Sequence, residues 1–196
     1  MYYRKINTKY IIAVIPIPGQ AGTGFIIQKS AVDDVLGFES ISDYICKLRV
    51  KGKFYNIIYT HIYIYVCVCV CALTEDKEED IKNQFCEELQ RVQNRVAKHD
   101  VTIILGGMNA KLWKDKLFSQ VVGCHTLHNI SNENGELVAN YAISYDMFLI
   151  STNFQHKAIY TKTWISADHQ TINQIDHVMI SKEKMILVHD VRSKRV

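Results

Sequence analysis

Residues 100–110, DVTIILGGMNA, decide the fold, because an apolar strand there runs directly into a glycine turn. The β-branched apolar run 101–105 is typical of a buried strand. Gly106 and Gly107 end the run, and Asn109 follows in the loop. Polar side chains that come directly after a buried strand lie where functional residues tend to be. The stretch therefore predicts a strand that carries a candidate site residue, Asn109, to the edge of a sheet.

Further stretches match one family in order along the chain. Residues 173–181, NQIDHVMIS, resemble the (Arg/Gln)-(Ile/Leu)-Asp-(Tyr/His) strand of the endonuclease/exonuclease/phosphatase superfamily, the deoxyribonuclease I-like nucleases. Residues 106–109 resemble its Gly-Asp-x-Asn motif. Thr-Trp at 163–164, GTGFII at 22–27 and ALTED at 72–76 match the retrotransposon branch of the family. The similarity is greatest to the endonuclease domain of non-LTR (LINE-type) retrotransposons and to craniofacial development protein 2-like proteins.

The resemblance implies an endonuclease that hydrolyses DNA phosphodiesters with Mg²⁺ or Mn²⁺ and no small-molecule cofactor. In such relatives one Asp activates or orients the attacking water, and a second Asp holds the catalytic imidazole in its productive tautomer. Here Gly107 stands at the first position and Asp176 at the second. Because loss of a general base removes roughly 10²- to 10⁴-fold of rate, we expect an inactive copy. Asn109 and Asp176 are the expected remaining catalytic residues, and no retained metal ligand is expected.

Two further motifs of the family are not found in the sequence. Its Asn-bearing strand and Gln-Glu motif precede the Gly-x-Gly-Phe strand, and residues 1–21 contain neither Asp nor Glu. Its Ser-Asp-His strand would follow the last residue, and SADH at 166–169 lies upstream of Asp176, so we expect it to be a loop. The prediction is a partial four-layer α/β sandwich of the deoxyribonuclease I-like type without its N-terminal and C-terminal strands. Residues 1–21 stay unassigned, and 22–196 form the truncated domain.

The periodicity of apolar residues completes the α/β prediction. They recur at helical spacing over 76–98, where Asp76 and Glu79 are placed like a capping box. A second helix is expected over 136–146, followed by a strand near 148–152. Alternating strands and helices are typical of layered α/β folds.

The dipeptide repeat at 62–71, IYIYVCVCVC, looks like a translated dinucleotide microsatellite. We interpret it as an insertion that lengthens a strand begun at 54–58. Three other interpretations stay open. Residues 54–72 approach the about 20 apolar residues of a transmembrane helix, and an uncharged β-prone run without proline predicts aggregation. A zinc site on one strand face would use Cys67, Cys69, Cys71 and His61.

Composition bounds the remaining function classes. A chain of 196 residues with 48% hydrophobic content buries one core and gives no reason to expect a second domain. The net charge of +3 and pI near 8.4 are below the values of a dedicated nucleic-acid-binding domain. DNA is therefore a partner implied by the resemblance alone, and the basic residues after 181 favour a solvated terminus. A residual DNA-binding module or a membrane-attached product is the alternative function.

Six cysteines without a clear secretion signal predict reduced thiols in the nucleus or cytoplasm. His125 and His128 lie near Cys124, but adjacency in sequence does not supply the geometry of a Cys/His nucleophile, so we expect loop residues. For Asn109 we favour a phosphate-facing role over a turn-capping role. For Trp164 we favour core packing over base stacking.

Overall fold

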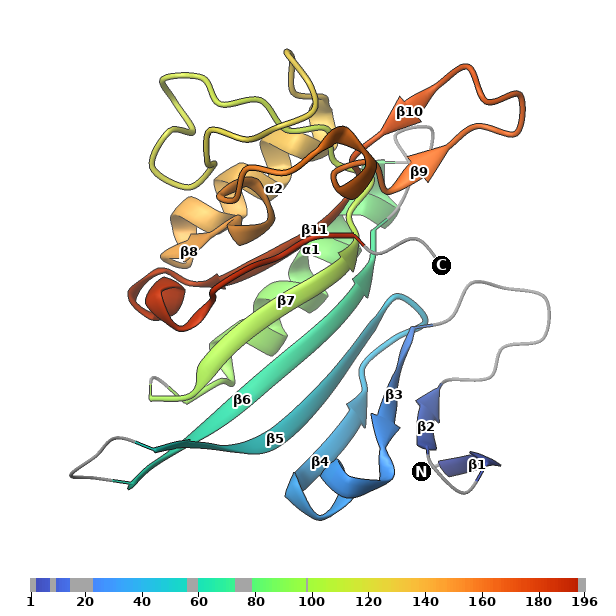
Figure 1. The fold of residues 1–196 in the computed structure, drawn as a ribbon, viewed down its shortest axis with the longest axis vertical. Helices are drawn as coiled ribbons and strands as arrows, with labels where there is room; N and C mark the ends of the chain where they lie inside the picture. The colour runs from blue at the N-terminus through green and yellow to red at the C-terminus, as the bar shows by residue number, and fades with distance from the viewer. Residues whose placement is uncertain are drawn as a thin grey trace. The chain divides into compact units, whose positions relative to one another are not determined.

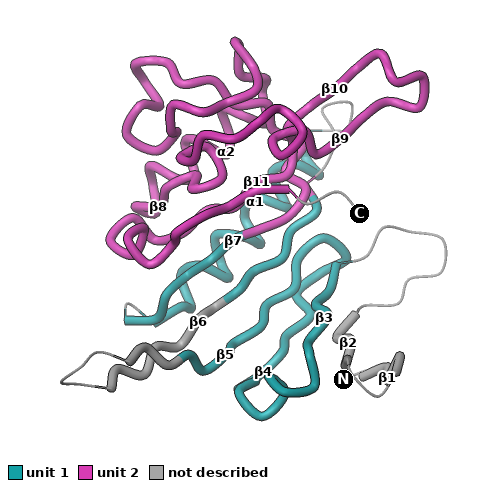
Figure 2. Tube along the Cα trace, viewed as in Figure 1, with its two compact units in different colours: residues 1–71, 77–104 teal, residues 72–76, 105–196 magenta. Residues whose placement is uncertain are grey.

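The computed structural model describes residues 3–7, 10–14, 23–55, 60–72, 79–97 and 99–193, with side chains placed over 23–52, 67–72, 79–97 and 99–193. The chain divides into two compact units (Figure 2). The first comprises Met1–Cys71 and Lys77–Ile104, and the second comprises Ala72–Asp76 and Leu105–Val196. Each unit contains strands and a helix, so the predicted α/β fold class is confirmed.

The first unit is built mainly from antiparallel strands (Figure 1). One sheet has the order β1 (Tyr3–Asn7), β2 (Tyr10–Val14), β3 (Gly24–Gln28). A 3-10 helix, η1 (Lys29–Asp34), leads to β4 (Val35–Ser40), β5 (Ile45–Tyr55) and β6 (Thr60–Cys71), which lie in that order beside β7 (Val101–Gly107). The first four residues of β7 belong to this unit and the last three to the second.

The core of the first unit confirms the buried strand expected at residues 101–105. Val101 and Thr102 are consecutive and both buried, so both faces of β7 are covered, as its continuous apolar run predicts. In β6, Val68 and Val70 are buried, whereas the alternating cysteines are half-buried. Arg49 Nη2 donates a hydrogen bond to Oδ2 of the buried Asp100 over 3.0 Å. This charge-assisted bond ties the start of β7 to β5.

The first predicted helix is α1 (Glu79–Asn94). Acidic Glu79 and Asp80 in its first turn and Arg91 in its last complement the helix dipole. Its buried residues, Leu89 and Val92, are three positions apart and so share one face. The expected cap at Asp76 lies outside the described residues.

The repeat forms the strand β6 and does not extend the strand begun at 54–58, so that prediction is wrong. β5 ends at Tyr55, and β6 pairs with it antiparallel from Tyr55↔Thr60 to Ile45↔Val70. An alternating β-branched and aromatic run suits such pairing along its whole length. The transmembrane-helix interpretation is also wrong, because these residues lie in strands. None of the helices in the described part of the chain has the length and apolar character needed to cross a bilayer.

The second unit combines short strands with a helix. β11 (Asp176–Ser181) lies between β7 and β8 (Met147–Phe148), and it pairs with β8 antiparallel. β9 (Trp164–Ile165) and β10 (Ile172–Asn173) form a separate two-stranded sheet. The remaining elements are α2 (Glu133–Ser144) and the 3-10 helices η2 (Ile150–Thr152), η3 (Ala158–Tyr160) and η4 (Lys182–Leu187). Buried Met108, Leu112, Met147, Leu149 and Met179 are among the core residues.

Three element boundaries differ from the sequence predictions. The helix expected from residue 136 begins at Glu133, because the Asn132 side chain caps it. The strand expected over 148–152 ends at Phe148, and Thr152 Oγ1 instead donates to Leu149 O and closes a turn. The strand expected over 173–181 divides into β10 and β11. The backbone N–H groups between them bond to side chains, those of His128 and Thr163.

Candidate functional site

The candidate site lies where β7 ends and β11 begins, within the second unit. A Cβ atom added to Gly107 would lie 3.3 Å from Asp176 Oδ1. The next residue, Met108, donates its N–H to the carbonyl of Ile175 over 2.9 Å, which fixes the two segments to each other. The two positions that the family resemblance places in one site are therefore adjacent.

Thr163 fixes the backbone at the start of β11. Its Oγ1 accepts hydrogen bonds from the N–H groups of Ile175 (3.0 Å) and Asp176 (3.1 Å). The Asp176 side chain is exposed. The neighbouring Trp164 is 42% exposed, so the expectation that it packs in the core is wrong. Its position in the short strand β9 places it outside the core of the unit.

Asn109 lies in the turn after β7 with a left-handed backbone, φ 47°. Asparagine tolerates this conformation better than most residues. Its Nδ2 donates to the carbonyl of Ala72 over 2.8 Å, and its own carbonyl accepts from Asn132 Nδ2 over 3.1 Å. An amide nitrogen carries two hydrogens, so one stays available for a second acceptor. Asn109 thus holds a turn in this structure, and its phosphate-facing role stays a prediction.

His177 is the buried counterpart of the exposed Asp176. Successive residues of a strand point to opposite faces, and His177 is 2% exposed. Its Nε2 lies 2.9 Å from the carbonyl of Ala110, which only accepts, so Nε2 carries the hydrogen. Nδ1, 3.1 Å from Ser151 Oγ, then accepts from that hydroxyl. Burial lowers the pKa of His177 to about 4. The imidazole is therefore neutral and holds the turn after β7 against β11.

A cavity of about 270 Å³ opens beside Asp176, and its lining includes Gly106, Thr163, His177, His156 and Arg192. His156 Nε2 lies 2.8 Å from Asp190 Oδ1, at an angle outside that of a hydrogen bond, so the contact is an ion pair when the imidazole is protonated. Arg192 Nε lies 3.3 Å from Asp190 Oδ2. The sequence analysis missed this group. No local motif marks it, because His156 and Asp190 are far apart in the chain.

The residues present do not fit a divalent metal ion. Mg²⁺ and Mn²⁺ bind carboxylate and carbonyl oxygens, and Asp176 is the one carboxylate among the residues that line this cavity. Within the described part of the chain, no three His, Cys, Asp or Glu side chains are grouped as a metal site requires. The half-buried cysteines of the repeat belong to no such group, and the side chain of His61 is outside the described residues.

Two sets of residues are loops, as predicted. Ser166–His169, the SADH sequence, turns between β9 and β10, where Ser166 Oγ donates to the Asp168 carboxylate and lowers its pKa. Cys124, His125 and His128 lie in the irregular segment before α2.

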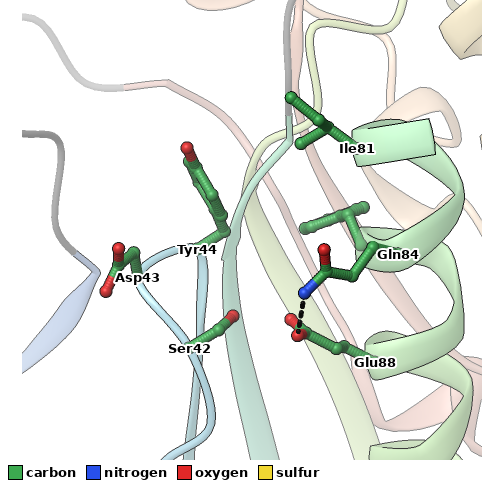
Figure 3. Close-up of a pocket in the computed structure, with 7 residues that line it drawn as sticks. Ser42, Asp43, Tyr44, Ile81, Gln84 and Glu88 are labelled. Carbon is green, nitrogen blue, oxygen red and sulfur yellow. Dashed lines mark hydrogen bonds between the residues drawn. The ribbon is translucent and has the colours of Figure 1, made fainter. Parts of the chain in front are cut away.

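The first unit has a separate pocket of about 210 Å³ (Figure 3). It lies between the turn that joins β4 to β5 and the exposed side of α1, and Gln84 Nε2 donates to Glu88 Oε1 there over 3.3 Å. Ser42, Asp43 and Tyr44 line the turn side. None of the predicted site residues lines this pocket.

No family model matches the sequence. Among curated proteins, the chain is similar to craniofacial development protein 2 of Tragulus javanicus and of Bos taurus, at 26% identity over 158 residues in each case. The matches cover 81% of this chain and 26% and 25% of those proteins. The chain thus spans about a quarter of the length of the curated relatives it matches. The predicted resemblance to craniofacial development protein 2-like proteins is confirmed.

Solved structures with a similar fold include three endonuclease/exonuclease/phosphatase-fold proteins. Humanized D. rerio TDP2 has a TM-score of 0.49 and 12% identity, covering 90% of this chain and 63% of that chain. The human Nocturnin catalytic domain with bound sulfate has a TM-score of 0.48 and 16% identity, covering 89% and 61%. A family protein from Leptotrichia buccalis has a TM-score of 0.45 and 13% identity, covering 90% and 62%. The similarity concerns the fold alone, and no residue role is taken from it.

Proposed function

We propose that this chain is a diverged, catalytically inactive copy of a retrotransposon-type endonuclease domain. The observation that carries the proposal is the position of Gly107, where an added Cβ would lie 3.3 Å from Asp176 Oδ1. A side chain at position 107 would enter the same site as the Asp176 carboxylate. The glycine leaves that place without a functional group.

The chemistry of phosphodiester hydrolysis explains why one missing carboxylate matters. The reaction needs a base for the attacking water and a positive group for the charge that develops on the phosphate. Asp176 supplies one carboxylate, and the neighbouring His177 is neutral and bonded through both ring nitrogens. We infer that the site orients a backbone turn and no longer activates water.

The proposed partner is DNA, the substrate class that the family resemblance implies. One observation favours contact without cleavage: the indole of Trp164 is exposed next to Thr163, which lines the cavity beside Asp176. Exposed aromatic rings stack on bases, and this is worth about 1–3 kcal/mol per base. A non-catalytic DNA-binding domain is therefore the second candidate function.

A plasmid assay tests the proposal. Supercoiled plasmid incubated with the purified chain in Mg²⁺ or Mn²⁺ is expected to show no nicking above the buffer control. Retardation of the plasmid in the same gels reports binding, which Trp164→Ala should weaken if the second candidate function is correct.

The contradicting result is metal-dependent nicking that disappears in Asp176→Asn and persists in Asp168→Asn. Asp168 is a matched control, since its carboxylate lies in the exposed turn between β9 and β10, away from the residues that line the cavity. Nicking that persists in both variants would indicate a contaminating nuclease and would leave the proposal standing.

A further inference from the structure

Two cysteines face each other across the pair formed by β5 and β6. Cys46 stands directly opposite Cys69 in the antiparallel register. Cys46 is fully buried, Cys69 is partly exposed, and the two thiols are hydrogen-bonded to each other. All six cysteines of the chain are free thiols, and the proposed function uses none of them.

The hydrogen-bond ladder sets the separation of the two backbones. The N–H of Cys71 donates to the carbonyl of Tyr44 over 2.9 Å, which identifies these opposed residues as a hydrogen-bonded pair. Such pairs recur at every second residue, so Cys46 and Cys69 form the next one, with Cα atoms about 5.5 Å apart. Disulfide-bonded cysteines have Cα separations of about 4.4–6.8 Å. A small approach of the Cβ atoms, which are about 4.5–5.5 Å apart in opposed residues, is enough for a bond.

The two thiols have unequal roles. The Cys46 thiol and the N–H of Gly24 both donate hydrogen bonds to the Cys69 sulfur, and the bond from Cys46 is the main reason that the pKa of Cys69 falls to about 7. The same bond and burial raise the pKa of Cys46. A thiolate is the nucleophilic form of cysteine. Cys69 is thus the reactive residue, and the protonated Cys46 is the residue that would bond to it.

We propose that Cys46 and Cys69 are a reversible redox pair that a hydroperoxide converts into a cross-strand disulfide. The Cys69 thiolate attacks hydrogen peroxide, so that an S–O bond forms, the O–O bond breaks and hydroxide leaves. The Cys46 sulfur then attacks the Cys69 sulfur. An S–S bond forms, the S–O bond breaks, and the oxygen leaves as water with the proton of Cys46. Two thiols are oxidised and one peroxide is reduced to two waters, and a dithiol reductant reverses the change.

The repeat supplies matched controls. Cys67 and Cys71 share a strand face with Cys69, because side chains alternate with a period of two. Cys67 stands opposite Leu48, and Cys71 stands opposite Tyr44. Neither has a cysteine across the ladder, so neither is expected to bond to Cys46.

Peptide mapping of the full chain tests the proposal. The reduced chain is treated with one equivalent of hydrogen peroxide, alkylated with N-ethylmaleimide and digested with trypsin. Cleavage after Lys29, Lys47, Lys53 and Lys77 gives one peptide with Cys46 and one with Cys67, Cys69 and Cys71. We expect these two peptides to be joined, with the loss of two hydrogens, and to separate after treatment with dithiothreitol. The joined peptide should vanish in Cys69→Ser and persist in Cys67→Ser and Cys71→Ser.

Fragmentation of the joined wild-type peptide assigns the bonded sulfur without any variant. Assignment to Cys67 or Cys71, persistence of the bond in Cys69→Ser, or the absence of a joined peptide from the folded wild-type chain would overturn the proposal. Circular dichroism of each sample verifies that the chain is folded.

Discussion

His177 is a single residue whose charge couples the stability of the second unit to pH. Burial lowers the pKa of its imidazole to about 4 in the folded chain, whereas an imidazole in an unfolded chain titrates near 6.5. Between these values the unfolded chain binds a proton that the folded chain does not. The stabilising effect is therefore complete above about pH 6.5 and is lost as the pH falls towards 4.

We expect this residue to remove about 3 kcal/mol from the free energy of unfolding between neutral pH and pH near 4. Urea unfolding at a series of pH values measures the change. His177→Gln should flatten the curve in this window, while His169→Gln, in the turn between β9 and β10, should leave it unaltered. Equal pH dependence in wild type and His177→Gln would show that another group is responsible.

At the same scale, part of the site was readable from the sequence. The adjacency of Gly107 and Asp176 was predictable, because each lies at the end of a strong apolar strand inside a recognisable motif. The hydrogen bond from Asn109 to Ala72 was not, since its acceptor is a backbone carbonyl far away in the chain. The pair of His156 and Asp190 was invisible for a similar reason.

Among the elements, α2 depends on Asn132 at its N-terminus. Asn132 Oδ1 accepts from the N–H groups of Gly135 (2.9 Å) and Lys111 (2.7 Å), and its Nδ2 donates to the carbonyl of Asn109. A Cβ at Gly135 would lie 2.0 Å from the carbonyl oxygen of Lys111, so the helix and this segment are in close backbone contact. One side chain therefore caps α2 and connects it to the turn after β7.

Asn132→Ala should lower the free energy of unfolding by about 2 kcal/mol, since loss of an N-cap costs about 0.5–2 kcal/mol and two further hydrogen bonds disappear. Asn140→Ala, an exposed position of α2, should change it by less than about 0.5 kcal/mol. Thermal or urea unfolding of both variants measures the difference. Equal stability of the two would contradict the capping role.

The element predictions failed where side chains compete with regular backbone pairing. Alternation in the repeat identified a strand, but its partner, the antiparallel β5, follows from pairing along the ladder and not from the pattern itself. The strand expected over 173–181 is interrupted because Thr163 Oγ1 takes two consecutive backbone N–H groups. A hydroxyl ten or more residues away leaves no signal in the local sequence.

For the whole molecule, the sequence predicted one domain with an unassigned start, 1–21, and a body, 22–196. The structure has two compact units, and β7 contributes to both. One boundary falls between Ile104 and Leu105, inside a continuous apolar strand, and no proline, glycine or charge run marks it. The α/β class was predictable because it needs only the periodicity of the apolar residues. The division was not, because it depends on which segments pack together.

The central claim is that Gly107 has removed a carboxylate from a divalent cation site beside Asp176. Titration with Mn²⁺, with free Mn²⁺ measured by electron paramagnetic resonance, tests this most directly in the wild-type chain, Gly107→Asp, and Gly107→Asp combined with Asp176→Asn. Gly37→Asp is the control, since an added Cβ there meets no atom within 4 Å. We predict no Asp176-dependent Mn²⁺ binding by the wild-type chain, a site gained in Gly107→Asp, and its loss in the double variant. Saturable Mn²⁺ binding by the wild-type chain that Asp176→Asn abolishes would contradict the account.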